Sequence, residues 1–200
     1  MENLEIYLIR HGKTYCNEKQ IYCGRSDVDL SENGIEELKN KKSRKLPECE
    51  FYFTSGLKRA NSTIDIIKPK QNYEILQDFS EYDFGDFELK GYNELKELKE
   101  YNNWINDESL KIKCPSGESR SQFRERISRA LRELICFMFK NNKKTALGIV
   151  HGGVIGMILE MEYDNTRKFY EWQPKNGEGY KIVINISDYN NYNIESVEKI

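Results

Sequence analysis

The sequence begins with the stretch that decides its fold, Leu4-Glu5-Ile6-Tyr7-Leu8-Ile9-Arg10-His11-Gly12. Its apolar residues form a short run that indicates a buried β-strand, and the histidine and glycine stand where that strand should end. The same arrangement returns far along the chain, where the apolar run Thr145 to Val150 leads into His151-Gly152-Gly153. Two buried strands that each end in histidine and glycine predict one sheet with both histidines at its carboxyl edge.

Around these two strands, further strands alternate with helices. The alternation, with no internal repeat and no linker rich in proline, glycine or serine, predicts a single domain over residues 1–200. We expect an α/β fold, a three-layer α/β/α sandwich around a mostly parallel central sheet. The expected strands are Leu4 to Ile9, Glu50 to Thr54, Tyr73 to Leu76, Thr145 to Val150, Tyr180 to Ile186 and Tyr192 to Val197, the last two with antiparallel character. The expected helices are Glu32 to Lys45, Leu57 to Lys68, Asn93 to Asn103, a long one that Ser119 and Gln122 cap, and Val154 to Met161.

Composition and charge narrow the classes of function. The 31 basic and 33 acidic residues give a net charge of −2, so no global field recruits nucleic acid or an anionic membrane. The five cysteines are an odd number and form no C-x-x-C pair, which argues against a disulfide framework and a thiolate zinc site. No apolar stretch approaches the ~20 residues of a membrane span, and the N-terminal apolar run is too short for a signal peptide. We therefore expect a cytoplasmic protein.

The chain contains two histidines, and each is followed at once by glycine. Chance would give both histidines a following glycine about once in two hundred sequences. A lone histidine after a strand is more often a structural hydrogen-bonding group, but two that converge on one sheet edge indicate a site. A metal site is the first alternative, yet Arg10 would repel a dication and suits an anion instead. The pattern predicts a phosphate pocket that needs no metal and no cofactor, in which the glycines let backbone N–H groups approach the anion.

Several motifs around these histidines resemble, in order and spacing, those of the histidine phosphatase superfamily, also called phosphoglycerate mutase-like. The region from Arg10 to Gly34 is most similar to short bacterial phosphatases such as α-ribazole phosphatase. Together the matches extend from residue 4 to residue 156. They comprise Leu8-Ile9-Arg10-His11-Gly12-Lys13-Thr14 with Asn17, Gly24-Arg25-Ser26-Asp27, Leu30-Ser31-Glu32-Asn33-Gly34, Thr54-Ser55-Gly56-Leu57-Lys58-Arg59-Ala60-Asn61-Ser62-Thr63, Ser80-Glu81-Tyr82-Asp83-Phe84-Gly85 and Val150-His151-Gly152-Gly153-Val154-Ile155.

The resemblance implies a role for each of a small set of residues. His11 is the expected nucleophile, whose neutral ring attacks phosphorus and holds the phosphoryl group until water takes it. Arg10, Arg59 and His151 are expected to bind the phosphate oxygens, His151 as an imidazolium. Glu81 is the expected general acid and base. The further phosphate-binding candidates are Asn17, Gly24 and Gly152. Gly24 and Arg25 are expected to line the mouth of the site and Lys13 to touch the substrate. The candidates for a lid over the leaving group are Phe84, Tyr92, Tyr101 and Trp104.

These assignments have ordinary structural alternatives. Arg59 would otherwise be a solvated helix residue, Asn17 a turn asparagine and Glu81 one acid among several in an exposed loop. Gly156 departs from the family pattern, since many relatives carry arginine there. That departure removes one possible contact to a substrate.

The expected reaction is hydrolysis of a small phosphorylated metabolite, and α-ribazole phosphate is one candidate. Within the family, the alternative is a cofactor-dependent phosphoglycerate mutase, which would need inserted segments that close over a bisphosphate and exclude water. A catalytically silent phosphate-binding regulatory module and a nucleotide-binding protein are the alternatives of other classes. Nucleotide binding is disfavoured because the chain has no G-x-x-x-x-G-K-[ST] motif. The expected binding partner is the small phosphorylated metabolite. Whether the protein forms a homodimer stays open.

Overall fold

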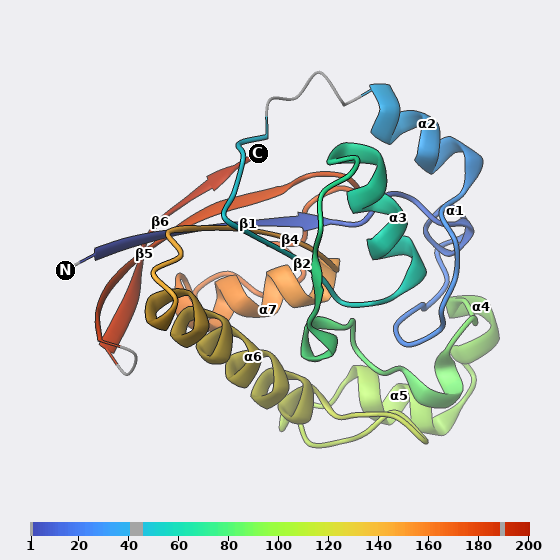
Figure 1. Ribbon diagram of the computed structural model, residues 1–200. Coiled ribbons are helices and arrows are strands. Elements are labelled where there is room, and N and C mark those ends of the chain that lie inside the picture. The colour runs from blue at the N-terminus through green and yellow to red at the C-terminus, as the bar shows by residue number, and fades with distance from the viewer. Residues whose placement is uncertain (1, 41–45, 189–190) are drawn as a thin grey trace.

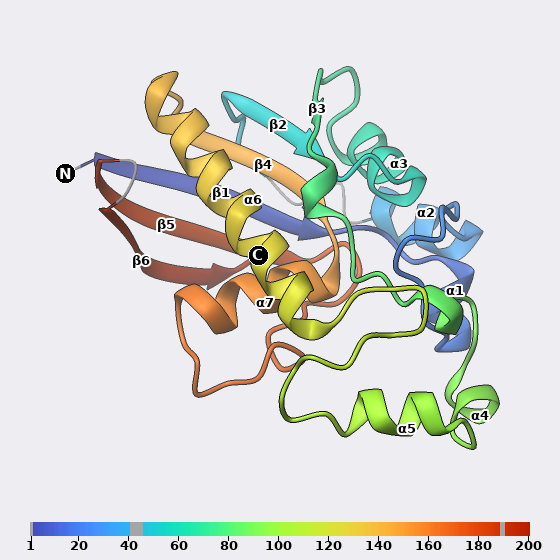
Figure 2. The ribbon, with the colours of Figure 1, turned by 90° about the horizontal axis from the view of Figure 1, so that it is seen from below.

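The computed structural model describes residues 2–40, 46–188 and 191–200. Within these ranges the strands are β1 (Glu2–Arg10), β2 (Phe51–Thr54), β3 (Glu74–Ile75), β4 (Thr145–Val150), β5 (Gly179–Asp188) and β6 (Asn191–Lys199). They form a central sheet in the order β3-β2-β4-β1-β5-β6 (Figures 1 and 2). Neighbouring strands from β3 to β1 are parallel, and β5 and β6 complete the sheet by antiparallel pairing. The mostly parallel sheet and the antiparallel character of its last two strands are both confirmed.

Helices cover both faces of the sheet. The helices of the described ranges are α1 (Tyr15–Lys19), α2 (Glu32–Asn40), α3 (Lys58–Ile67), α4 (Tyr92–Leu95), α5 (Lys99–Ile105), α6 (Arg120–Lys140) and α7 (Gly152–Glu162), with 3₁₀ turns η2 (Gln77–Phe79) and η3 (Gly85–Phe87). α3 lies on one face with α2 beside it, and α6 and α7 lie on the other (Figures 1 and 2). The three-layer α/β/α sandwich is therefore confirmed.

The side chains of β1 alternate between two cores, because successive residues of a strand point to opposite faces. Ile6 belongs to the core under α6 and α7, which also contains Ile127 and Ile158. Tyr7 belongs to the core under α3, which contains Ile64. The first strand is thus covered on both sides, as its nearly continuous apolar run predicts.

Two local expectations are wrong. The helix expected from Asn93 to Asn103 is instead two short helices, α4 and α5, because Leu98 between them has an extended backbone. Asn102 stabilises this break by donating its side-chain amide to the carbonyls of Lys96 and Leu98, at 2.8 and 3.0 Å. The loop expected after β1 contains the helix α1, whose five residues are too few to show a helical period. The predicted helix end at Lys45 lies outside the described residues.

The longest helix, α6, begins where its capping box predicts. The Ser119 side chain accepts from the backbone N–H of Gln122, and the Gln122 side chain accepts from the backbone N–H of Ser119. Phe123 and Ile127 then belong to its buried face, as their spacing indicates. In the described ranges, neither α6 nor another helix combines the length and apolar character that crossing a membrane requires.

The register of the sheet brings distant parts of the chain to one edge. Arg10 of β1 is paired with Val150 of β4, so His11 and His151 each follow one member of the same pair. β2 ends beside β4, and the turn after it leads into α3, which carries Arg59. The carboxyl ends of these parallel strands therefore form the edge at which ligands bind in α/β sheets.

Candidate active site

His11 and His151 lie together at this edge, with their ring centroids 5.1 Å apart. Both side chains are buried, as their exposed fractions of 5% and 0% show. The predicted convergence of the two histidines is confirmed. The Nδ1 atom of His11 lies 2.7 Å from the carbonyl oxygen of Gly12, which can only accept, so Nδ1 carries the ring proton. The Nε2 atom then keeps its lone pair, which is the state a nucleophile needs.

The pKa of each histidine lies well below its ordinary value. For the pKa of His11 the causes are burial first and then the charges of Arg59 and Arg10. For the pKa of His151 burial again comes first, followed by Arg59 and then by His11. Burial and these charges therefore favour the neutral form of both rings in the free protein. The imidazolium expected at position 151 stays a prediction for the phosphate-bound site, because in the free protein burial and the neighbouring positive charges disfavour an extra proton on this ring.

Ser55 orients the ring of His151, with its Oγ 2.8 Å from Nε2. When this hydroxyl donates to Nε2, the Nδ1 atom of His151 carries the ring proton and can donate it to an anion. The sequence motif around Arg59 includes Ser55, but nothing in the motif indicated a role for it. Its place directly after β2, at the same sheet edge, was the available signal.

Three buried side-chain atoms in the described ranges have no hydrogen-bond partner: Nε of Arg10, Nε of Arg59 and Nδ1 of His151. Buried polar atoms are nearly always hydrogen-bonded, so each such atom needs an explanation. All three belong to residues that the sequence assigns to phosphate binding, and each can donate. An anion bound beside His11 would give these donors an acceptor.

Backbone carbonyls hold one terminal nitrogen of Arg10 and both terminal nitrogens of Arg59. Arg10 donates through Nη1 to Pro174, at 2.9 Å. Arg59 is 1% exposed and donates to Gly24 at 2.6 Å and to Ser26 at 2.8 Å. Both guanidinium groups are thus held in place before a ligand arrives, which is the property that electrostatic catalysis requires.

Gly152 allows Arg10 to lie against the start of α7. A Cβ atom at this position would lie 3.1 Å from Cζ of Arg10 and 3.2 Å from its Nε. A side chain here would therefore press on the guanidinium group. Burial lowers the pKa of Arg10, and the carboxylate of Glu81 opposes that shift.

The side chain of Glu81 lies against the first turn of α7, near Arg10. Its Oε2 atom accepts from the backbone N–H of Gly153 and its Oε1 atom accepts from that of Tyr82, both at 2.9 Å. A Cβ atom on Gly153 would lie 2.3 Å from Oε1, so glycine is needed for this approach. Glu81, which the family resemblance indicated as the general acid and base, therefore lies at the sheet edge that holds both histidines.

A partly buried ion pair holds the loop that carries Glu81. Arg126 of α6 pairs with Glu118 at 2.6 Å and donates to the carbonyls of Asp78 and Ser80 at 2.7 and 2.8 Å. The sequence pattern did not indicate Arg126, because helical periodicity marks only the apolar residues of a buried face. A charged residue at such a position is recognisable only once the carbonyls that it binds are in place.

Asn17 lines the cavity beside these residues. Its amide oxygen accepts from the backbone N–H of Thr14 at 3.0 Å, as part of the cap of α1. The NH₂ group is therefore the part of the side chain turned away from the cap. Asn176 lies next to it and donates to the carbonyl of His11 at 3.0 Å. No motif in the sequence indicated Asn176.

Gly24, Lys13 and Arg25 are the other candidates that the sequence offers. The carbonyl of Gly24 accepts a hydrogen bond from Arg59. Gly24 therefore contacts a phosphate-binding candidate and is not one of the residues with an unpartnered donor. Lys13 forms an ion pair with Glu37 at 2.6 Å on the surface. Arg25 is exposed.

A cavity of about 570 Å³ opens beside the catalytic candidates. Phe84 and Trp104 of the expected lid line it, whereas Tyr101 is buried behind it and Tyr92 is 63% exposed. Cys23 also lines it, but burial raises the pKa of its thiol to about 12, so the thiol is protonated and is no competing nucleophile. The lining comprises Arg10, Asn17, Ile21, Tyr22, Cys23, Glu81, Tyr82, Phe84, Trp104, Ile105, Arg120, Phe123, Gly153, Met157, Phe169, Tyr170 and Gln173.

The departure at Gly156 has a structural reason. A Cβ atom there would lie 2.1 Å from the carbonyl oxygen of Phe169. The chain around Phe169 therefore occupies the space that an arginine at this position would need. Phe169 and Tyr170 line the cavity instead, which makes this side of it aromatic.

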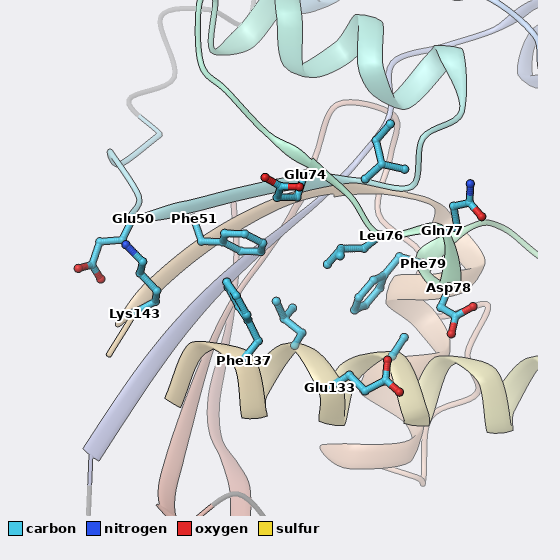
Figure 3. A pocket seen from close by; sticks show the side chains of 13 residues that line it. Glu50, Phe51, Glu74, Leu76, Gln77, Asp78, Phe79, Glu133, Phe137 and Lys143 are labelled. Carbon is cyan, nitrogen blue, oxygen red and sulfur yellow. The ribbon is translucent and has the colours of Figure 1, made fainter. Parts of the chain in front are cut away.

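A second cavity, of about 860 Å³, lies between β3 and α6 (Figure 3). Phe51, Leu76 and Phe137 line it, together with acids that include Glu74 and Glu133. Its charged lining residues are the four acids Glu50, Glu74, Asp78 and Glu133 and one base, Lys143. This cavity therefore does not suit a phosphate group.

The two neutral histidines make stability depend on pH. Below their ordinary pKa of 6.5 the unfolded chain takes up protons that the folded rings do not bind, so the free energy of unfolding falls as the pH falls. We expect a loss approaching roughly 1.4 kcal/mol per pH unit for each histidine between about pH 6.5 and 5. Urea unfolding at about pH 7.5, 6 and 5 measures it. The variant His11→Ala should show a shallower dependence, and a pH-independent wild type would contradict the assignment.

Comparison with known proteins identifies a family and several similar proteins. The sequence model of the histidine phosphatase superfamily (branch 1) matches residues 6–185. The chain is 28% identical over 162 residues to an adenosylcobalamin/α-ribazole phosphatase of Escherichia coli (strain K12), covering 78% of this chain and 77% of that protein. Its fold is similar to the α-ribazole phosphatase from Shigella flexneri (TM-score 0.80, 22% identity, 97% and 96% of the two chains). It is also similar to a phosphoglycerate mutase from Bacillus anthracis str. Sterne (TM-score 0.78, 21% identity, 98% and 92%).

Proposed function

Because this chain belongs to the histidine phosphatase superfamily (branch 1), we propose that it is a phosphoric monoester hydrolase that works through a phosphohistidine on His11. The observation that carries the proposal is the set of unpartnered buried donors on Arg10, Arg59 and His151. They surround a histidine whose Nε2 lone pair is available. A phosphoryl group satisfies such donors and presents its phosphorus to that nitrogen.

In the first step, Nε2 of His11 attacks phosphorus and the bond to the leaving oxygen breaks. Glu81 takes up the proton of the ester monoanion when the substrate binds and gives it to the leaving oxygen, so the leaving group departs as a neutral alcohol. Arg10 and Arg59 bind the non-bridging oxygens, where charge is concentrated in the transition state. The Nδ1 proton of His11 continues to be donated to the Gly12 carbonyl, and this hydrogen bond stabilises the charge of the phosphorylated ring.

In the second step, water attacks the phosphorus of the phosphohistidine. Glu81, now a carboxylate, takes a proton from the water as its oxygen bonds to phosphorus. The bond between phosphorus and Nε2 breaks, which returns the lone pair to His11. Inorganic phosphate then leaves, and the free enzyme is restored.

The cavity supports a leaving group with an apolar or aromatic part. Beyond Glu81 it is lined by Tyr22, Phe84 and Trp104. α-Ribazole phosphate, after which the relative from Escherichia coli is named, is the substrate candidate that this lining favours. A cytoplasmic location and a homodimer stay predictions.

A phosphoglycerate mutase is the alternative inside the family. Its substrate carries a carboxylate, which needs a cation at the far end of the cavity. Among the described lining residues, Arg120 is the cation there, and it donates to the Ile105 carbonyl at 3.1 Å and lies over the Trp104 ring. The aromatic lining of Tyr22, Phe84 and Trp104 favours a less polar ester over this substrate.

Purified protein should hydrolyse p-nitrophenyl phosphate and α-ribazole phosphate in the presence of EDTA, and should turn over 3-phosphoglycerate poorly. In the described ranges no group of three or more His, Cys, Asp or Glu side chains is arranged to hold a metal ion, so we expect activity that survives chelation. Loss of activity on chelation with recovery on adding zinc would contradict the mechanism. Phosphate binding without turnover of any ester would favour the silent regulatory module.

A further inference from the structure

The carboxylate of Glu88 accepts hydrogen bonds from a run of backbone N–H groups in a distant loop. Gly24 donates to both of its oxygens at 3.0 and 3.1 Å, Arg25 donates at 2.9 Å and Ser26 at 3.2 Å. Phe84 adds a further backbone N–H at 3.2 Å. Successive N–H groups that converge in this way form a concave anion-binding nest. Here the anion is a side chain of the protein itself.

The opposite side of the same loop holds a catalytic candidate. The carbonyls of Gly24 and Ser26 accept from the two terminal nitrogens of Arg59, at 2.6 and 2.8 Å. The peptide group that joins Gly24 to Arg25 therefore binds Arg59 through its carbonyl and Glu88 through its N–H. Hydrogen bonds arranged in such a chain polarise one another.

The loop has little room to adjust. A Cβ atom on Gly24 would lie 1.6 Å from the carbonyl oxygen of Tyr82 and 2.7 Å from Glu88. The loop thus lies directly against the residue that follows Glu81. Because both terminal nitrogens of Arg59 are bound to this loop, the direction of its Nε atom depends on where the loop lies.

We propose that Glu88 is a positioning residue for the phosphate site: it fixes the loop of residues 24–26, and that loop orients Arg59. The inference rests on the proposed function only in taking Arg59 to bind the phosphoryl group. Glu88 is half-buried, and its hydrogen bonds go to backbone N–H groups of the loop and of Phe84. Its effect on the anion site therefore passes through Gly24 and Ser26.

The first test removes the charge and keeps the shape. Glu88→Gln should weaken binding of inorganic phosphate, measured by calorimetry, and lower kcat/KM for p-nitrophenyl phosphate by about 10²-fold, the effect of a small misplacement of a clamping group. Glu94→Gln is the matched control, since Glu94 also accepts from a backbone N–H, that of Gly91, but at the exposed start of α4. It should leave both quantities unchanged.

Added acetate gives a second test, because it can replace a missing carboxylate. In Glu88→Ala, acetate should raise kcat/KM and phosphate affinity in a saturable way, while it does not raise them in the wild type or in Glu94→Gln. Glu88→Asp keeps the charge with a shorter side chain and should lose roughly 10-fold, which provides a folded variant if the others are unstable.

A double-mutant cycle decides whether the effect passes through Arg59. Glu88→Gln in an Arg59→Ala background should change phosphate affinity by less than about 3-fold, since the residue it positions is gone. An equal loss in both backgrounds would overturn the inference, as would a lower melting temperature with unchanged affinity in the folded protein. Phosphate binding is measured without turnover, so these outcomes stay separate from a failure of the proposed hydrolysis.

Discussion

His11→Ala should abolish hydrolysis, with a loss in kcat on the order of 10⁴–10⁶-fold. The reason is that the neutral Nε2 atom is the group that bonds to phosphorus, and the remaining donors on Arg10, Arg59 and His151 cannot form that bond. Rapid quenching of the wild type with a ³²P-labelled ester should trap an acid-labile, base-stable phosphoprotein. The variant should show no such label.

The same variant also tests whether the site itself survives. His11→Ala should still bind inorganic phosphate, because Arg10 and Arg59 are held by backbone carbonyls rather than by His11. Binding with no turnover would place the loss in the chemical step. Turnover near the wild-type level, or label retained in the variant, would contradict the assignment of His11 as nucleophile.

Glu81→Gln should slow hydrolysis by about 10²–10⁴-fold for esters with poor leaving groups. The amide cannot deliver a proton to the leaving oxygen, and an alkoxide needs one far more than a p-nitrophenolate does. The loss in the rate of phosphoryl transfer to His11 should therefore be larger for an alkyl phosphate than for p-nitrophenyl phosphate. Single-turnover measurements with both esters separate this step from release of phosphate.

Asp86→Asn is the control for this substitution. It removes the same charge from an exposed acid in the same loop, five residues along the chain. The control should hydrolyse both esters at the wild-type rate. An equal loss for both leaving groups in Glu81→Gln would point to a disturbed site instead, since Glu81 also binds the N–H of Gly153.

The architecture and most of the catalytic candidates could be predicted before any contact was known. Apolar runs of strand length that alternate with helices indicate the layers of the sandwich, because burial on both faces of a parallel sheet leaves no polar alternation. The repeated ending of strand, histidine and glycine predicts that His11 and His151 meet at one sheet edge. Arg59 and Glu81 needed the family resemblance, since neither spacing nor composition distinguishes one helix arginine or one loop acid from its neighbours.

The contacts that hold these residues became apparent only in the folded chain. Ser55 on His151, Arg126 behind Glu81 and Glu88 against the loop of residues 24–26 join parts of the chain that no local pattern connects. The charge state of His151 could not be predicted from the sequence either. The pKa of a side chain depends on its burial and on the charges that surround it, and both are set by how distant segments pack.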